Sequence, residues 1–120
     1  MKQQIRELVR LKYGNKCAYC GCELGKVFHV DHIEAYWHSM TENQCERAGI
    51  KKGVDSIENY NPACPRCNRW KSTFDIETFR KEISEQLNRL YRYNNNYRMA
   101  FDYGMITENR EPIKFYFEKI

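Results

Sequence analysis

Cys17-Ala18-Tyr19-Cys20 and Cys64-Pro65-Arg66-Cys67 are the two Cys-x-x-Cys pairs of this chain, and residues 21–63 separate them. A single pair is a weak signal, because redox sites share its spacing. Two pairs supply four thiolates, which is the number that a tetrahedral zinc ion takes. We therefore expect Cys17, Cys20, Cys64 and Cys67 to hold one structural Zn²⁺, with four buried, unligated thiols as the alternative. Such an ion has no open position and should not be catalytic.

Polar side chains suited to phosphodiester chemistry lie between and after these pairs. Asp31 and His32 end the run Val27–His32, in which β-branched and aromatic residues predict a short strand. Asn59 precedes the second pair, and Asn68 follows it directly. Neighbouring side chains on a regular strand point to opposite faces. Asp31 and His32 can therefore serve one site only if the strand bends or ends there.

Sequence patterns before and between the two cysteine pairs, and directly after the second pair, predict short helices. Residues 3–13 carry apolar side chains at helical spacing, and Gly14 is placed to end that helix. Residues 33–58 form an insertion, in which Thr41-Glu42-Asn43-Gln44 predicts a capping box and a helix to about Ala48. Residues 59–62, Asn-Tyr-Asn-Pro, have the chemistry of a turn. A helix carrying Asn68 should follow the second cysteine pair.

The second half of the chain predicts a longer helix and a strand. Asp75 suits the N-cap of a helix that runs to Tyr91, and its apolar stripe predicts core packing, with a dimer surface as the alternative. Residues 97–103 predict a further helix that ends at Gly104. Apolar residues at 113, 115 and 117 alternate with polar ones, which predicts a terminal strand with one buried face.

Composition favours a single intracellular domain. The chain has 120 residues, 42% of them hydrophobic, and six cysteines. No apolar run approaches the roughly 20 residues that span a bilayer, and the N-terminus lacks the apolar centre of a signal peptide. We expect one domain over residues 1–120 in the reducing cytoplasm, where cysteines bind metals more often than they form disulfides. The sequence does not set the oligomeric state, and a monomer is the simplest case.

Charge points to a phosphate-bearing partner only through its distribution, because the net charge is a mild +4. One basic cluster lies near the N-terminus, and Arg66, Arg69 and Lys71 surround the second cysteine pair. Clustered cations of this kind can follow the phosphates of a nucleic acid. We expect these three side chains to contact DNA, with a solvated basic face as the alternative.

The order of these motifs resembles the cysteine-containing HNH endonucleases, a branch of the ββα-metal (His-Me finger) nucleases, and in particular their small phage-type members. The resemblance rests on Cys-x-Tyr-Cys-Gly, Val-Asp-His-Ile, Asn59, Cys-Pro-Arg-Cys-Asn and Lys71, and covers about residues 5–72. It implies an α+β fold: a treble-clef-like ββα-metal core with a structural zinc. An N-terminal helix and a helical and stranded extension over about residues 73–120 would flank this core.

The resemblance also implies roles for four residues. His32 matches the general base that activates water, and Asn59 matches the position that holds the loop bearing this base. Asp31 and Asn68 match the ligands of a catalytic Mg²⁺ or Mn²⁺. A histidine has an unperturbed pKa of about 6.5 and can accept a proton near pH 7, and carboxylate and amide oxygens suit hard cations. No small-molecule cofactor is implied.

Several positions leave alternatives open. Some relatives have a third ligand of the catalytic cation, a histidine four residues after the position of Asn68, where this chain has Ser72. A site with two protein ligands favours Mg²⁺ over the softer transition metals. His29 fits a strand surface, with metal binding as the alternative, and His38 is either a DNA contact or simply exposed. Cys22 lies close enough to compete as a zinc ligand. A zinc-stapled module that binds nucleic acid without cutting it is the alternative function, although zinc binding alone requires neither Asp31, His32 nor Asn68.

Overall fold

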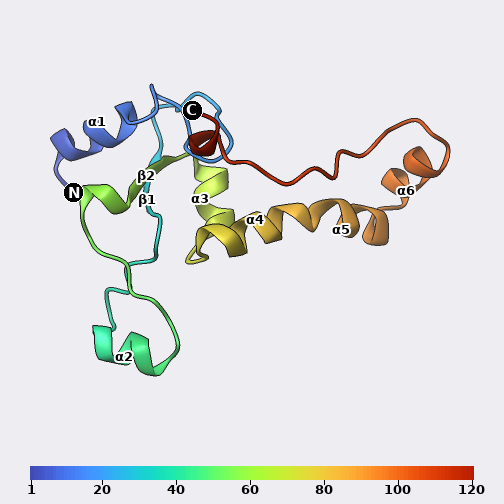
Figure 1. Ribbon diagram of the computed structural model, residues 1–120. Coiled ribbons are helices and arrows are strands. Elements are labelled where there is room, and N and C mark those ends of the chain that lie inside the picture. Colours follow the sequence, from blue (N-terminus) through green and yellow to red (C-terminus); the bar gives the residue numbers. More distant parts are fainter.

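Two short strands and the helix that follows them form the centre of the molecule (Figure 1). In the computed structural model, which describes residues 1–120, β1 (His29–His32) pairs antiparallel with β2 (Tyr60–Ala63), and α3 (Pro65–Lys71) follows β2 almost directly. Helix α1 (Gln3–Leu11) packs on β2, and α3 contacts both strands. The predicted α+β class and its ββα core are therefore confirmed.

Local sequence explains where these helices begin and end. Helix α3 starts because the Cys64 sulfur accepts a hydrogen bond from the Cys67 N–H, while Pro65 occupies a first-turn position that needs no donor. Gly14 has a φ of 64°, the left-handed conformation expected of a residue that follows a helix end. Within α1, Val9 is buried but Leu8 is 60% exposed, so the apolar face is narrower than its spacing indicates.

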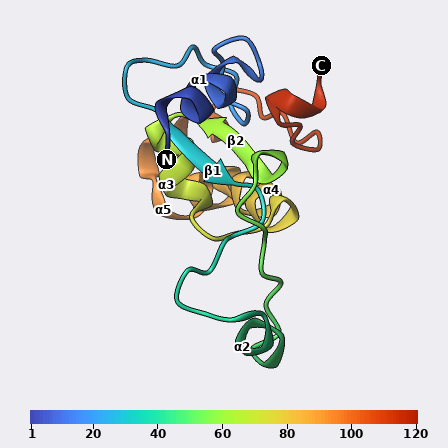
Figure 2. The ribbon, with the colours of Figure 1, turned by 90° about the vertical axis from the view of Figure 1, so that its left-hand side faces the viewer.

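The insertion between the strands forms a small lobe that stands away from the core (Figures 1 and 2). It contains α2 (Glu42–Arg47), and Thr41 and Gln44 form the predicted capping box. A short 3₁₀ helix, η1 (Ile57–Asn59), leads back into β2. The prediction of a turn at residues 59–62 is wrong, because Tyr60–Ala63 is strand β2. A two-stranded sheet consists of edge strands only, and an edge strand tolerates Pro62.

Three helices after the core form an extended arm (Figure 1). They are α4 (Ile76–Ser84), α5 (Gln86–Tyr93) and α6 (Asn95–Asp102), so the single helix predicted to Tyr91 is interrupted at Glu85. The apolar stripe packs into the core only in its first half: Phe79 is buried, whereas Leu90 and Tyr91 are each 38% exposed. The molecule measures 51 × 37 × 23 Å, and none of its helices is long and apolar enough to cross a membrane.

The hydrophobic core surrounds Tyr19, the residue between the first two cysteines. Its ring contacts Phe79, Phe115 and Phe117 edge to face, with centroids 5.5, 5.5 and 6.1 Å away. The predicted terminal strand is wrong, because residues 116–118 form a 3₁₀ helix, η2 (Tyr116–Glu118). The N–H groups of its first two residues donate to the carbonyls of Tyr19 and Ala18, 3.0 and 2.9 Å away, in place of a strand partner. The extension therefore completes the core.

Candidate metal centre and catalytic pocket

The four predicted zinc ligands come together. The ligand sulfur atoms of Cys17, Cys20, Cys64 and Cys67 lie within 4.8 Å of one another, and the Cys20 and Cys64 sulfurs are 3.9 Å apart. Zinc–sulfur bonds of about 2.3 Å in a tetrahedron require sulfur atoms just under 4 Å apart. The four residues therefore fit one zinc ion with every position filled. Cys22 is exposed and is not one of these four, but its thiol interacts with those of Cys20 and Cys64.

Backbone groups around the cluster favour thiolate ligands. The Cys64 N–H donates to the Cys17 sulfur, and the Cys67 N–H donates to the Cys64 sulfur, each over 3.4 Å. Hydrogen bonds from the Cys67 thiol and from backbone N–H groups lower the pKa of Cys17 to about 4. Gly21 turns the chain after the first pair with a φ of 78°, and a side chain there would meet the Tyr116 ring at 2.8 Å. The backbone N–H donors therefore favour the thiolate form that zinc binding requires.

A second site lies beside the cluster, between β1 and α3. Asp31, His32 and Asn68 line one shallow pocket of about 160 Å³. Strand β1 ends at His32, which allows two neighbouring residues to face one space. The structure therefore brings together the three residues to which the family resemblance assigns metal binding and proton abstraction.

Asp31 is buried at the base of this pocket. One of its carboxylate oxygens, Oδ2, accepts a hydrogen bond from the Tyr19 hydroxyl and lies 3.1 Å from the Lys71 ammonium. Burial raises the pKa of Asp31, and Lys71 and Tyr19 oppose this shift. The other oxygen has no protein partner among the hydrogen bonds. With the Asn68 amide, this leaves two oxygen donors of the kind that suits Mg²⁺ or Mn²⁺.

Lys71 is the one predicted DNA contact that the structure contradicts. Its side chain is fully buried, and its ammonium donates to the His32 carbonyl over 2.9 Å in addition to pairing with Asp31. It follows Cys67 by four residues, so the helix turns its side chain toward the interior together with that of Cys67. Arg66 and Arg69 lie on the exposed side of α3.

Removing the Lys71 charge should destabilise the fold strongly. We expect Lys71→Met to lower the free energy of unfolding by about 3–5 kcal/mol, because it leaves the Asp31 carboxylate buried without its cation. Adding Asp31→Asn, which keeps an acceptor for Tyr19, should restore most of the loss. Urea unfolding of the single and double variants measures both effects, and Lys81→Met on an exposed helix face is the control. An unchanged midpoint for Lys71→Met would contradict this role.

Asn59 closes the base of the insertion. Its amide nitrogen donates to the carbonyls of Glu34 and Val54, each over 2.8 Å, and its amide oxygen accepts from the Glu34 N–H over 2.9 Å. Gly53 has no space for a side chain here, because a Cβ would lie 2.0 Å from the Glu34 carbonyl oxygen. These contacts join the two ends of the insertion next to His32.

The other two histidines do not line the pocket. His29 is exposed at the start of β1, opposite Ala63, and His38 is exposed in the insertion with its ring 4.5 Å from that of Tyr36. Sequence reasoning missed two residues of the site, Tyr19 and Asp55. Tyr19 belongs to the motif Cys-x-Tyr-Cys-Gly, but nothing in the sequence indicates its contact with Asp31, and Asp55 lies in an insertion without periodicity.

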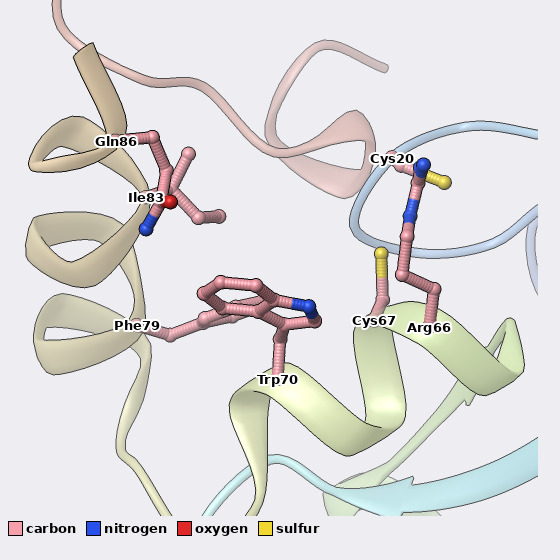
Figure 3. Close-up of a pocket in the computed structure, with 7 residues that line it drawn as sticks. All are labelled: Cys20, Arg66, Cys67, Trp70, Phe79, Ile83 and Gln86. Atoms are coloured by element: carbon pink, nitrogen blue, oxygen red, sulfur yellow. The ribbon is translucent and has the colours of Figure 1, made fainter. Parts of the chain in front are cut away.

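An apolar groove runs along the opposite side of α3 (Figure 3). It has a volume of about 360 Å³ between α3 and α4, and Trp70, Phe79 and Ile83 are among the residues that line it. The Arg66 guanidinium lies near Cys20 at one end, and Gln86 lies at the other. This groove shares no residue with the pocket that contains His32.

The fold combines a ββα core with a four-cysteine cluster and an adjoining pocket that contains Asp31, His32 and Asn68. Residues 17–74 match the family described as HNH endonuclease, a stretch that includes both cysteine pairs and every residue of the catalytic pocket. This stretch is therefore similar to an HNH endonuclease domain, and domains of that family act on nucleic acids. No curated protein and no solved structure matches the chain.

Proposed function

We propose that this protein is a metal-dependent endonuclease that hydrolyses phosphodiester bonds in DNA and carries a structural zinc. The observation that supports this most directly is the shared pocket of Asp31, His32 and Asn68 within a stretch similar to an HNH domain. A non-catalytic zinc module would need none of these three side chains. The proposed unit is the whole chain, because Phe79 and Phe115 of the extension are buried in the core.

Each proposed role follows from the chemistry of the side chain. Asp31 and Asn68 would hold Mg²⁺ or Mn²⁺, and His32 would take a proton from the attacking water. When bound, the cation neutralises negative charge on the phosphate and on the leaving oxygen. The buried Lys71 ammonium pairs with Asp31 and holds its carboxylate in place. The phosphate contacts would come from Arg66 and Arg69, whose guanidinium groups can each bind two phosphate oxygens at once.

Nicking of supercoiled plasmid tests this function. The purified protein should convert supercoiled plasmid to the open-circular or linear form with Mg²⁺ or Mn²⁺, and should stop when the added cation is omitted. Zinc content and circular dichroism should be measured in both conditions, so that loss of the catalytic cation is separated from loss of structural zinc. Protein that is folded and zinc-loaded, and that retards DNA in a gel without cutting it, would favour the binding-module alternative.

A further inference from the structure

The His32 imidazole contacts a carboxylate that does not line the pocket. Its Nε2 atom lies 2.9 Å from Oδ1 of Asp55, a residue of the insertion, and the Tyr60 hydroxyl donates to the same oxygen over 2.6 Å. We propose that Asp55 is the positioning residue of the general base: it holds the His32 imidazole in the tautomer that carries its proton on Nε2. This inference rests on the proposed nuclease function.

The direction of the hydrogen bond follows from the state of the carboxyl group. Hydrogen bonds from Tyr60 and His32 lower the pKa of Asp55, so its carboxylate is ionised at neutral pH. An ionised carboxylate can only accept hydrogen bonds. The neutral imidazole must therefore donate from Nε2, which leaves the lone pair on Nδ1 free to accept a proton. Nδ1 has no hydrogen-bond partner among the protein groups.

The His32 ring is held in place by packing as well as by its hydrogen bond to Asp55. Loss of that hydrogen bond should therefore change the tautomer more than it changes the position of the ring. Tyr36 stacks on the imidazole with centroids 5.6 Å apart, and Tyr60 meets it edge to face at 5.2 Å. His38 lies at 6.3 Å, and the Lys71 ammonium contacts only the backbone carbonyl of His32. Two aromatic rings thus hold the ring in place, and Asp55 is the only carboxylate with a hydrogen bond to it.

The insertion is built to deliver Asp55 to this position. Asn59 binds the carbonyl of Val54, the residue directly before Asp55, and the same amide group binds Glu34 on the other side of the insertion. The Gly53 N–H also donates to the Ala35 carbonyl over 2.9 Å. The peptide chain on either side of Asp55 is therefore fixed, on one side by Asn59 and on the other by β2.

This arrangement assigns a defined proton path. Nδ1 of His32 takes a proton from water as the water oxygen bonds to phosphorus, which breaks one O–H bond and forms one N–H bond. The imidazole is then cationic, and the Asp55 carboxylate on its far side stabilises that charge. The leaving oxygen departs with the electrons of its bond to phosphorus and takes up a proton from solvent, and His32 later returns its proton to solvent. No oxidant, reductant or further reactant is needed.

Two measurements on the full, zinc-loaded protein test Asp55. The first is long-range ¹H–¹⁵N correlation NMR of histidine-labelled protein at a pH where His32 is neutral, which distinguishes the two tautomers without any need for activity. Wild type should show the Nε2–H form of His32, and Asp55→Asn should lose that single form, because an amide can donate to Nε2 as well as accept from it. Wild type in the Nδ1–H form, or an unchanged signal in Asp55→Asn, would overturn the proposal.

The second measurement is the rate of DNA cleavage. We expect Asp55→Asn to lower kcat by about 10- to 100-fold, less than removal of the base itself, with KM, zinc content and melting temperature unchanged. Glu58→Gln is the matched control, because Glu58 is an exposed acid of the same insertion without a contact to His32. Equal kcat values for Asp55→Asn and wild type would overturn the positioning role. A folded wild type that does not cut DNA would refute the nuclease function, while the NMR result would still decide whether Asp55 sets the tautomer.

Discussion

His32→Ala should lower the rate of DNA cleavage by roughly 10²- to 10⁴-fold, the usual contribution of a positioned general base. The pocket offers no second imidazole, since His29 and His38 do not line it. Affinity for DNA should remain close to that of wild type, because we assign the phosphate contacts to Arg66 and Arg69. Excess Mg²⁺ should not restore activity, because Asp31 and Asn68 are still present to bind it.

A nicking time course and a binding titration with the same DNA check this result. His29→Ala removes the same type of side chain three residues earlier on the same strand, and it should cut at the wild-type rate. If His32→Ala cuts as fast as wild type, His32 is not the base and the nuclease interpretation of this pocket is wrong.

Removal of zinc should unfold the whole protein. The apparent binding free energy of structural zinc sites at neutral pH is about 10–16 kcal/mol, whereas domains of ordinary stability unfold at a cost of about 5–15 kcal/mol. The cluster also joins two segments separated by residues 21–63, and Cys17, Cys64 and Cys67 are themselves part of the buried core. Without the metal bonds, the packing of Tyr19 and the hydrogen bond from the Ala18 N–H to the Pro62 carbonyl would have to hold the first cysteine pair against β2.

Elemental analysis should find one zinc per chain in protein purified under reducing conditions. Cys64→Ser, or a strong chelator, should abolish the cooperative thermal transition seen by circular dichroism. Cys45→Ser is the control, because Cys45 is a free thiol of α2 that lies in the insertion and outside the cluster. Reduced protein that lacks zinc yet melts at the wild-type temperature would show that the four sulfurs are not a structural site.

The four-cysteine cluster could be predicted from the sequence because two Cys-x-x-Cys pairs supply a tetrahedral ligand set wherever they meet. The ββα core was implied by the resemblance to HNH endonucleases and not by spacing alone. The strand β2 was missed because asparagine and proline are typical of turns, and only its pairing with β1 overrides that preference. Local propensity contains no information about such a partner.

Parts of the site depend on contacts between distant residues and could not be predicted. Lys71 appeared to be a free surface cation, but its helix face is set by the need of Cys67 to reach the cluster. Tyr19 and Asp55 bind Asp31 and His32 from positions 12 and 23 residues away. The terminal segment alternates like a strand, yet its N–H groups bond to the loop of the first cysteine pair. Periodicity predicted the burial of Phe115, but it could not predict that the next two N–H groups donate to the carbonyls of Tyr19 and Ala18.

The hydrogen bonds that join the two ends of the insertion allow the chain to be lengthened between those ends. Asn59 and Gly53 join the two ends near Glu34, and α2 stands clear of the core beyond them (Figure 2). The entropic cost of a longer loop grows only with the logarithm of its length once its ends are fixed. A reporter peptide or a small folded tag could thus be carried between α2 and Gly53, providing a handle for labelling the protein without altering either end of the chain.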